Sequence, residues 1–94
     1  MRILGLLILK DAASTYADAA KAVAVWRTKV EAARWTNLVE LKADFASADY
    51  VDPFIVFNIR GNNYRLIAVV DFTEKIVHVR GFFTHSEYDK GNWK

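Results

Sequence analysis

Cysteine is absent from this 94-residue chain, and its only methionine is residue 1. The chain can therefore form neither a disulfide framework nor a thiolate metal site, and it suits a reducing cytoplasm. One proline, four glycines and no repeat or low-complexity tract leave no candidate linker. We therefore expect a single domain over residues 1–94, large enough for one modest core.

Long hydrophobic runs are also missing. The N-terminal segment from Ile3 to Leu9 is apolar, but it is too short for a membrane span and no signal-peptidase-like site follows it directly. We expect it to be mature structure, with a short edge strand at Arg2–Leu4 and a helix from about Gly5 to Ser14, and we expect no membrane association. Because Leu6 to Leu9 are apolar around the whole helix, the segment should be buried or covered by a partner.

Neither sign of charge dominates, since 13 Lys and Arg oppose 11 Asp and Glu for a net charge of +2. A polyanionic partner is compatible with this balance only if the basic side chains share a face.

The spacing of apolar residues predicts two further helices. Asp18 is placed to cap the second, in which Ala19, Val23, Trp26, Val30 and Ala33 recur at intervals of three and four. The segment Ala32 to Trp35 ends it. Thr36 is then placed to cap a short third helix that runs through Glu40, Leu41, Lys42 and Phe45.

The rest of the chain predicts a three-stranded antiparallel meander. Its runs are rich in β-branched and aromatic residues and cover Phe54–Ile59, Tyr64–Phe72 and Lys75–Phe83. The connections are too short for parallel crossovers. The middle run is apolar on both faces and should be the central strand, covered on each side. The sequence therefore indicates an α+β fold, with two to three N-terminal helices on a small sheet that also includes the N-terminal edge strand.

Two residues in these runs are unusual. Arg65 opens the central strand, and the pattern alone leaves open whether it reaches water at the strand entrance or has a function. Gly81 lies just before His85 and predicts a bulge that re-aims it.

The side chains available for chemistry exclude several classes of enzyme. No two histidines have metal-ligand spacing, since His78 and His85 are seven apart and would lie on opposite faces of a regular strand; glycine-rich phosphate loops and Ser-His-Asp elbows are also missing. What remains is His85 and Tyr88 beside the guanidinium groups of Arg60, Arg65 and Arg80. This combination suits metal-free phosphodiester cleavage, although a lone histidine beside a tyrosine in a C-terminal tail more often has a structural role.

Several separated blocks carry a family resemblance. They are Ala33-Arg34-Trp35, Leu41-Lys42, Phe45, Ser47-Ala48-Asp49, Phe57-Asn58-Ile59, Gly61-Asn62, Tyr64-Arg65-Leu66-Ile67 and Thr84-His85-Ser86-Glu87-Tyr88-Asp89-Lys90, followed by Trp93-Lys94. In order and spacing this set, from about Asp18 to Lys94, resembles the HigB family, bacterial type II toxins with a RelE-like fold.

The resemblance implies a ribosome-dependent mRNA endoribonuclease of the cytoplasm that needs no cofactor. A HigA-type helix-turn-helix antitoxin would hold it in check in a hetero-oligomer. Arg65 would face the phosphate, His85 would protonate the departing 5′-oxygen, and Tyr88 would act as a base or orienting group. Attack by the 2′-hydroxyl would leave a 2′,3′-cyclic phosphate without help from a metal.

We expect the remaining basic residues to act through RNA and ribosome affinity: Arg34, Lys42, Arg60, Arg80, Lys90 and Lys94. The N-terminus departs from the family, which usually carries Ser, Arg and Lys where this chain has Gly5, Leu6 and Leu7. That change bears on ribosome affinity and enlarges the surface that a partner chain could cover.

The alternative from another class is a catalytically silent RNA- or partner-binding module of the same fold. The presence of both Arg65 and His85 favours the enzyme. An antitoxin or transcription factor is disfavoured, because the sequence offers no helix-turn-helix pair and its last third is rich in strands.

Overall fold

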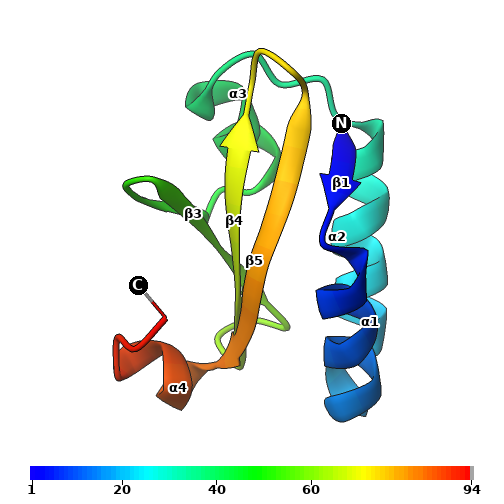
Figure 1. Ribbon diagram of the computed structural model, residues 1–94, viewed down its shortest axis with the longest axis vertical. Helices are drawn as coiled ribbons and strands as arrows, with labels where there is room; N and C mark the ends of the chain where they lie inside the picture. The colour runs from blue at the N-terminus through cyan, green and yellow to red at the C-terminus, as the bar shows by residue number, and fades with distance from the viewer. Residues whose placement is uncertain (94) are drawn as a thin grey trace.

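The computed structural model describes residues 1–93, which form helices on a mixed five-stranded sheet (Figure 1). In chain order the elements are β1 (Arg2–Leu4), α1 (Leu6–Thr15), the 3₁₀ turn η1 (Ala17–Ala19), α2 (Ala20–Ala32), α3 (Leu38–Asp44), β2 (Asp49–Val51), β3 (Phe54–Ile59), β4 (Tyr64–Asp71), β5 (Ile76–Thr84) and α4 (His85–Asp89). The strand order is β1-β5-β4-β3-β2, with only β1 and β5 parallel. This confirms the predicted α+β fold with an N-terminal edge strand and is consistent with the RelE-like class.

The central strand of the sheet is β4, as its two apolar faces predicted. Leu66 and Ala68 point into the main core, whereas Arg65 and Ile67 are buried on the opposite face of the sheet. Both faces are therefore covered over the first half of the strand, and Arg65 is placed on the face away from α1 and α2.

Helices α1, α2 and α3 cover the core face, and α1 and α2 run side by side next to β1 and β5 (Figure 1). All five residues of the predicted apolar stripe on α2 are buried. The indole of Trp26 packs edge to face on Phe57 of β3, with ring centroids 5.4 Å apart. This stripe fixes α2 on the sheet through burial of apolar surface.

On α1 the apolar cluster divides between the core and solvent. Leu9 is buried, but Leu6 is 39% and Leu7 69% exposed. The segment was expected to be buried or covered by a partner. Burial within the chain is confirmed for Leu9 and is wrong for Leu7. No helix among residues 1–93 is long and apolar enough to cross a membrane.

The prediction that Asp18 caps the second helix was wrong. Asp18 lies in η1, and α2 begins at Ala20 without a side-chain cap. Its carboxylate instead accepts hydrogen bonds from Tyr64 Oη at 2.7 Å and from Arg60 Nη1 at 3.2 Å. The bond to Asp18 raises the pKa of the Tyr64 phenol. Both partners lie in the β3–β4 hairpin, far from Asp18 in the sequence, so the residues next to Asp18 could not predict these bonds.

Thr36 was also wrongly predicted as a cap, because Asn37 caps α3 by accepting the Glu40 N–H at 2.9 Å. Thr36 contributes differently, since both its N–H and its hydroxyl donate to Glu40 Oε1 at 2.6 Å. These bonds stabilise the charged carboxylate and hold the pKa of Glu40 below its usual value.

Replacing Thr36 by valine should raise the pKa of Glu40 toward its usual value, because the donating hydroxyl is lost. Since the pKa is lowered in the folded state, the stabilisation is present at neutral pH and disappears as the pH falls through the folded pKa. An NMR titration of the Glu40 carboxyl measures this. Thr28→Val is the matched control, because Thr28 bonds only to a helix carbonyl; an equal change there would contradict the assignment.

Two elements were missed from the sequence. Strand β2 has only three residues, and its pairing with β3 rather than its composition makes it a strand. Helix α4 carries a recognisable signal, the Thr84-x-x-Glu87 capping box, in which each residue accepts the backbone N–H of the other.

Candidate active site

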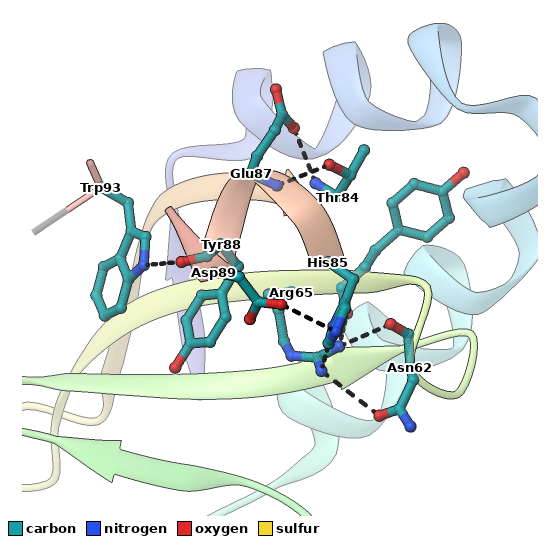
Figure 2. Close-up of polar contacts among 9 residues, drawn as sticks. Asn62, Arg65, Thr84, His85, Glu87, Tyr88, Asp89 and Trp93 are labelled. Carbon is teal, nitrogen blue, oxygen red and sulfur yellow. Dashed lines mark hydrogen bonds and ion pairs between the residues drawn. The ribbon is translucent and has the colours of Figure 1, made fainter. Parts of the chain in front are cut away.

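The site is centred on Arg65, a guanidinium that is 8% exposed on β4. Nη1 donates to the carbonyl oxygens of Asn62 at 3.0 Å and of Tyr64 at 3.2 Å, and Nη2 reaches Asn62 Oδ1 at 3.5 Å (Figure 2). This burial rules out the alternative that the Arg65 side chain reaches water at the entrance of the strand.

The charge of Arg65 is uncompensated within the described part of the chain. No carboxylate of residues 1–93 lies within 4.0 Å of it, and every acceptor that it contacts is neutral. A buried cation without a counter-ion is costly to fold. Such a group is therefore poised to bind an anion.

A β-bulge brings His85 to the face of Arg65. The register pairs Ile67 with Gly81 but Ala68 with Val79, so Arg80 is an extra residue on β5. Bulges reverse the alternation of faces beyond them. Before the bulge, odd-numbered residues of β5 such as Val79 face the core. After the bulge, odd-numbered residues face the other side of the sheet, where Phe83 pairs with Arg65.

The expected bulge is thus confirmed, and it corrects the expectation for the two histidines. His78 is paired with Val69 and so shares the face of Arg65, as His85 does, but His78 lies far along β5. A Cβ at position 81 would lie 2.5 Å from the Phe83 ring, so any larger residue there would require that ring to move.

His85 is the first residue of α4, and its position is fixed on three sides. Its backbone N–H donates to the Asn63 carbonyl at 3.0 Å, beside the Thr84–Glu87 capping box. Its Nδ1 is 3.0 Å from Arg65 Nη2, and its Nε2 is 3.1 Å from Asp89 Oδ2 (Figure 2).

These contacts fix the tautomer of His85. A guanidinium has donors only, so Nδ1 must accept from Arg65 and carries no proton. The proton of the neutral ring is then on Nε2, which faces the Asp89 carboxylate at 3.1 Å. Arg65, His85 and Asp89 thus form a relay of polar contacts.

Tyr88 forms the wall of the site next to Arg65. The Arg65 Cζ atom lies 5.6 Å from the ring centroid, within the range of a cation–π contact. Trp93 stacks on Tyr88 at 5.1 Å and 13°, donates from Nε1 to the Tyr88 carbonyl at 3.0 Å, and packs edge to face on Phe54. This packing holds α4 and the residues after it near β3 and β4.

A cavity of about 380 Å³ opens beside Arg65 and Tyr88 and is lined in part by Lys42. The predicted catalytic residues Arg65, His85 and Tyr88 therefore lie together, and Lys42 lies at their edge. No three His, Asp or Glu side chains of residues 1–93 converge as a metal site would require.

The other predicted RNA-binding residues are dispersed. Arg60 pairs with Asp18 beside a separate cavity of about 510 Å³, and Arg34 lies next to Met1 and Lys75. Arg80 is exposed at the bulge, and Lys90 is exposed at the end of α4. Lys94 lies outside the described residues.

Sequence reasoning missed three residues that complete the site. Asn62 and Asp89 hold Arg65 and His85, and Trp93 supports Tyr88. The i, i+4 spacing of His85 and Asp89 would have suggested their contact once α4 had been recognised from its capping box.

Comparison of the sequence with known protein families identifies a match. Residues 19–91 match HigB_toxin, described as the RelE-like toxic component of a toxin-antitoxin system. The mRNA interferase toxin HigB of Escherichia coli strain K12 is 34% identical over 84 residues, covering 86% of this chain and 81% of that protein. The mRNA interferase HigB of Shigella flexneri matches to the same extent. That of Escherichia coli O6:H1 strain CFT073 is 27% identical over 93 residues, 96% of this chain and 90% of the relative.

Proposed function

Because this chain belongs to the HigB family of RelE-like toxins, we propose that it is an mRNA interferase that cuts mRNA on the ribosome. A toxin of such a system has an antitoxin partner, and we propose a helix-turn-helix protein of the HigA type in a hetero-oligomer. The cytoplasm, where ribosomes work, is the proposed location. The observation that carries the enzymatic proposal is the buried, uncompensated Arg65 guanidinium in contact with His85.

The proposed reaction is an internal transfer at one phosphate. The 2′-oxygen forms a bond to phosphorus as its proton passes to water, the bond from phosphorus to the 5′-oxygen breaks, and the protonated His85 ring gives a proton to that oxygen. Arg65 stabilises the charge that develops on the phosphate oxygens. His85 supplies the proton to the leaving oxygen, and Tyr88 holds the guanidinium in position or assists removal of the 2′-proton.

Substrate binding would convert His85 into an acid. In the free protein Arg65 donates to Nδ1, which blocks a second proton on the ring. A bound phosphate offers Arg65 a charged acceptor, which forms a stronger hydrogen bond than a neutral one. Once Arg65 turns to the phosphate, Nδ1 can take up a proton, and the imidazolium is stabilised by Asp89 on Nε2. The acid would thus form only when a phosphate is present.

Replacing Asp89 by asparagine should slow cleavage by about tenfold, because the imidazolium loses its anionic partner. Asp89→Glu keeps the carboxylate and should retain more activity than Asp89→Asn. Equal losses in the two variants would contradict the relay.

The proposal is tested by incubating defined mRNAs with the protein, with and without ribosomes. Cleavage should require ribosomes and yield a cyclic phosphate and a 5′-hydroxyl, and chelation should not stop it while magnesium suffices for ribosome assembly. A 5′-phosphate and a 3′-hydroxyl would indicate attack by metal-activated water and overturn the mechanism. No cleavage in either condition would favour the silent binding module.

Removing a single peripheral charge should weaken ribosome binding without abolishing chemistry. With a net charge of +2 the protein should bind free RNA weakly, so the ribosome supplies much of the positioning. We expect Arg80→Ala to need more ribosomes for half-maximal cleavage, more so at higher salt, with the rate at saturation kept. Efficient, sequence-selective cutting of naked RNA by the wild type would contradict ribosome dependence.

A further inference from the structure

Four polar side chains line the 380 Å³ cavity beside Arg65 and make no hydrogen bond or ion pair among residues 1–93: Lys42, Ser47, Asp49 and Asn58. This sets Asp49 apart. Among residues 1–93 every other aspartate except Asp11 has a hydrogen-bond or ion-pair partner. Lys42, Ser47 and Asp49 are exposed and Asn58 is half-buried, so these groups bind water when no ligand is present. Polar groups gathered around a cavity can supply the specific contacts of a ligand site.

The sheet register explains why these groups meet. Asn58 on β3 is paired with Arg65 on β4, and Asp49 on β2 is paired with Val56 on β3. Directly paired residues of antiparallel strands lie on the same face. Val56 is 2% exposed and lies two residues before Asn58, so an apolar strip separates Asp49 from Arg65. The cavity thus has a mostly polar lining, with the Asp49 carboxylate on one side and the Arg65 guanidinium on the other, and the buried Val56 between them.

We infer that this cavity is a base pocket that selects guanine at a nucleotide flanking the scissile phosphate, with Asp49 accepting hydrogen bonds from the guanine N1–H and N2–H groups. This rests on the proposed function, because Arg65 places the phosphate. Guanine presents two adjacent donors that match the two oxygens of a carboxylate, whereas adenine, cytosine and uracil present one donor group at that edge. The guanine O6 is then left for a donor, which the Asn58 amide or the Lys42 ammonium supplies.

The first test maps cleavage ends on mRNAs translated on ribosomes. The wild type should cut mainly where guanine occupies one fixed position beside the cut. Asp49→Asn should lower cleavage at those sites by about ten- to a hundredfold, the usual discrimination of a bidentate pair, while cuts at other bases persist. Asp11→Asn is the matched control, because Asp11 is exposed on α1 and makes no hydrogen bond or ion pair with the residues that the structure describes. Cutting without guanine preference by the wild type, or an unchanged preference in Asp49→Asn, would overturn the base pocket and leave the proposed function intact.

The second test needs no cleavage. Amide shifts of isotope-labelled protein are followed during titration with guanosine 3′-monophosphate and, separately, adenosine 3′-monophosphate. The guanosine nucleotide should shift the amides of residues 49 and 58 at concentrations about tenfold lower, and Asp49→Asn should remove the difference. If the protein cuts no RNA, the proposed function fails and this titration still decides the pocket. Equal responses to both nucleotides would reject guanine selection.

Discussion

Replacing Arg65 by alanine should lower mRNA cleavage on ribosomes by about 10² to 10⁴-fold, because the positive charge at the proposed phosphate position is removed. His85→Ala should have an effect of similar size through loss of the proton donor. Each variant also breaks the Arg65–His85 contact, so the double variant should be little worse than the single ones. Rates of single-site cleavage on programmed ribosomes measure all three.

His78→Ala is the matched control for His85→Ala. His78 is exposed and lies on the same face of the sheet, yet it is distant from Arg65 along β5. It should cleave as the wild type does and arrest growth when expressed, whereas the Arg65 and His85 variants should do neither. Thermal unfolding of each variant separates lost chemistry from lost folding. If His85→Ala remains fully toxic at equal protein level, another residue is the acid, and Tyr88 is the first to be tested.

Gly5→Ala should cause the largest loss of stability among alanine substitutions of the four glycines. Gly5 joins β1 to α1 at φ +87°, and a Cβ there would lie 2.6 Å from the backbone oxygen of Val79 on β5. The backbone conformation alone costs an alanine about 1 kcal/mol or more. The clash adds to it because a strand backbone cannot move aside, so we expect a total of about 3 kcal/mol in urea unfolding.

Gly61→Ala separates the two causes. Gly61 has a similar φ of +64°, but a Cβ there would meet nothing within 4 Å. It should cost about 1 kcal/mol, which is the conformational part alone. Equal losses of stability in Gly5→Ala and Gly61→Ala would show that the close approach of Gly5 to Val79 does not contribute to the cost of the Gly5 substitution.

Patterns of burial were the part of the fold that sequence could predict. The stripe from Ala19 to Ala33 follows from helical periodicity and the three strand runs from their β-branched and aromatic composition, and both were confirmed, with the ends of the last two strands shifted by one residue. Periodicity works for the stripe because this segment buries one continuous surface. It failed for β2, since three residues are too few to show a period.

Polar partners were the part that sequence could not predict. Asp18 is a good cap by type, but a phenol and a guanidinium from the β3–β4 hairpin bind it instead. The same limit applies to the site. Residue types and the family resemblance singled out Arg65, His85 and Tyr88. Neither indicated which group accepts from Arg65, or that Asp49 has no hydrogen-bond or ion-pair partner among residues 1–93. Such facts depend on the register of strands distant in sequence.

The extra residue Arg80 on β5 has a consequence for how the gene can vary. Between Val79 and Thr84 the identity of the side chains matters less than their number, because each added or lost residue turns everything beyond it to the other side of the sheet. A single-codon insertion or deletion in this stretch would direct His85 toward α1 and α2, away from Arg65. Related toxins that share this site should therefore differ here by substitution and keep the length of the segment constant.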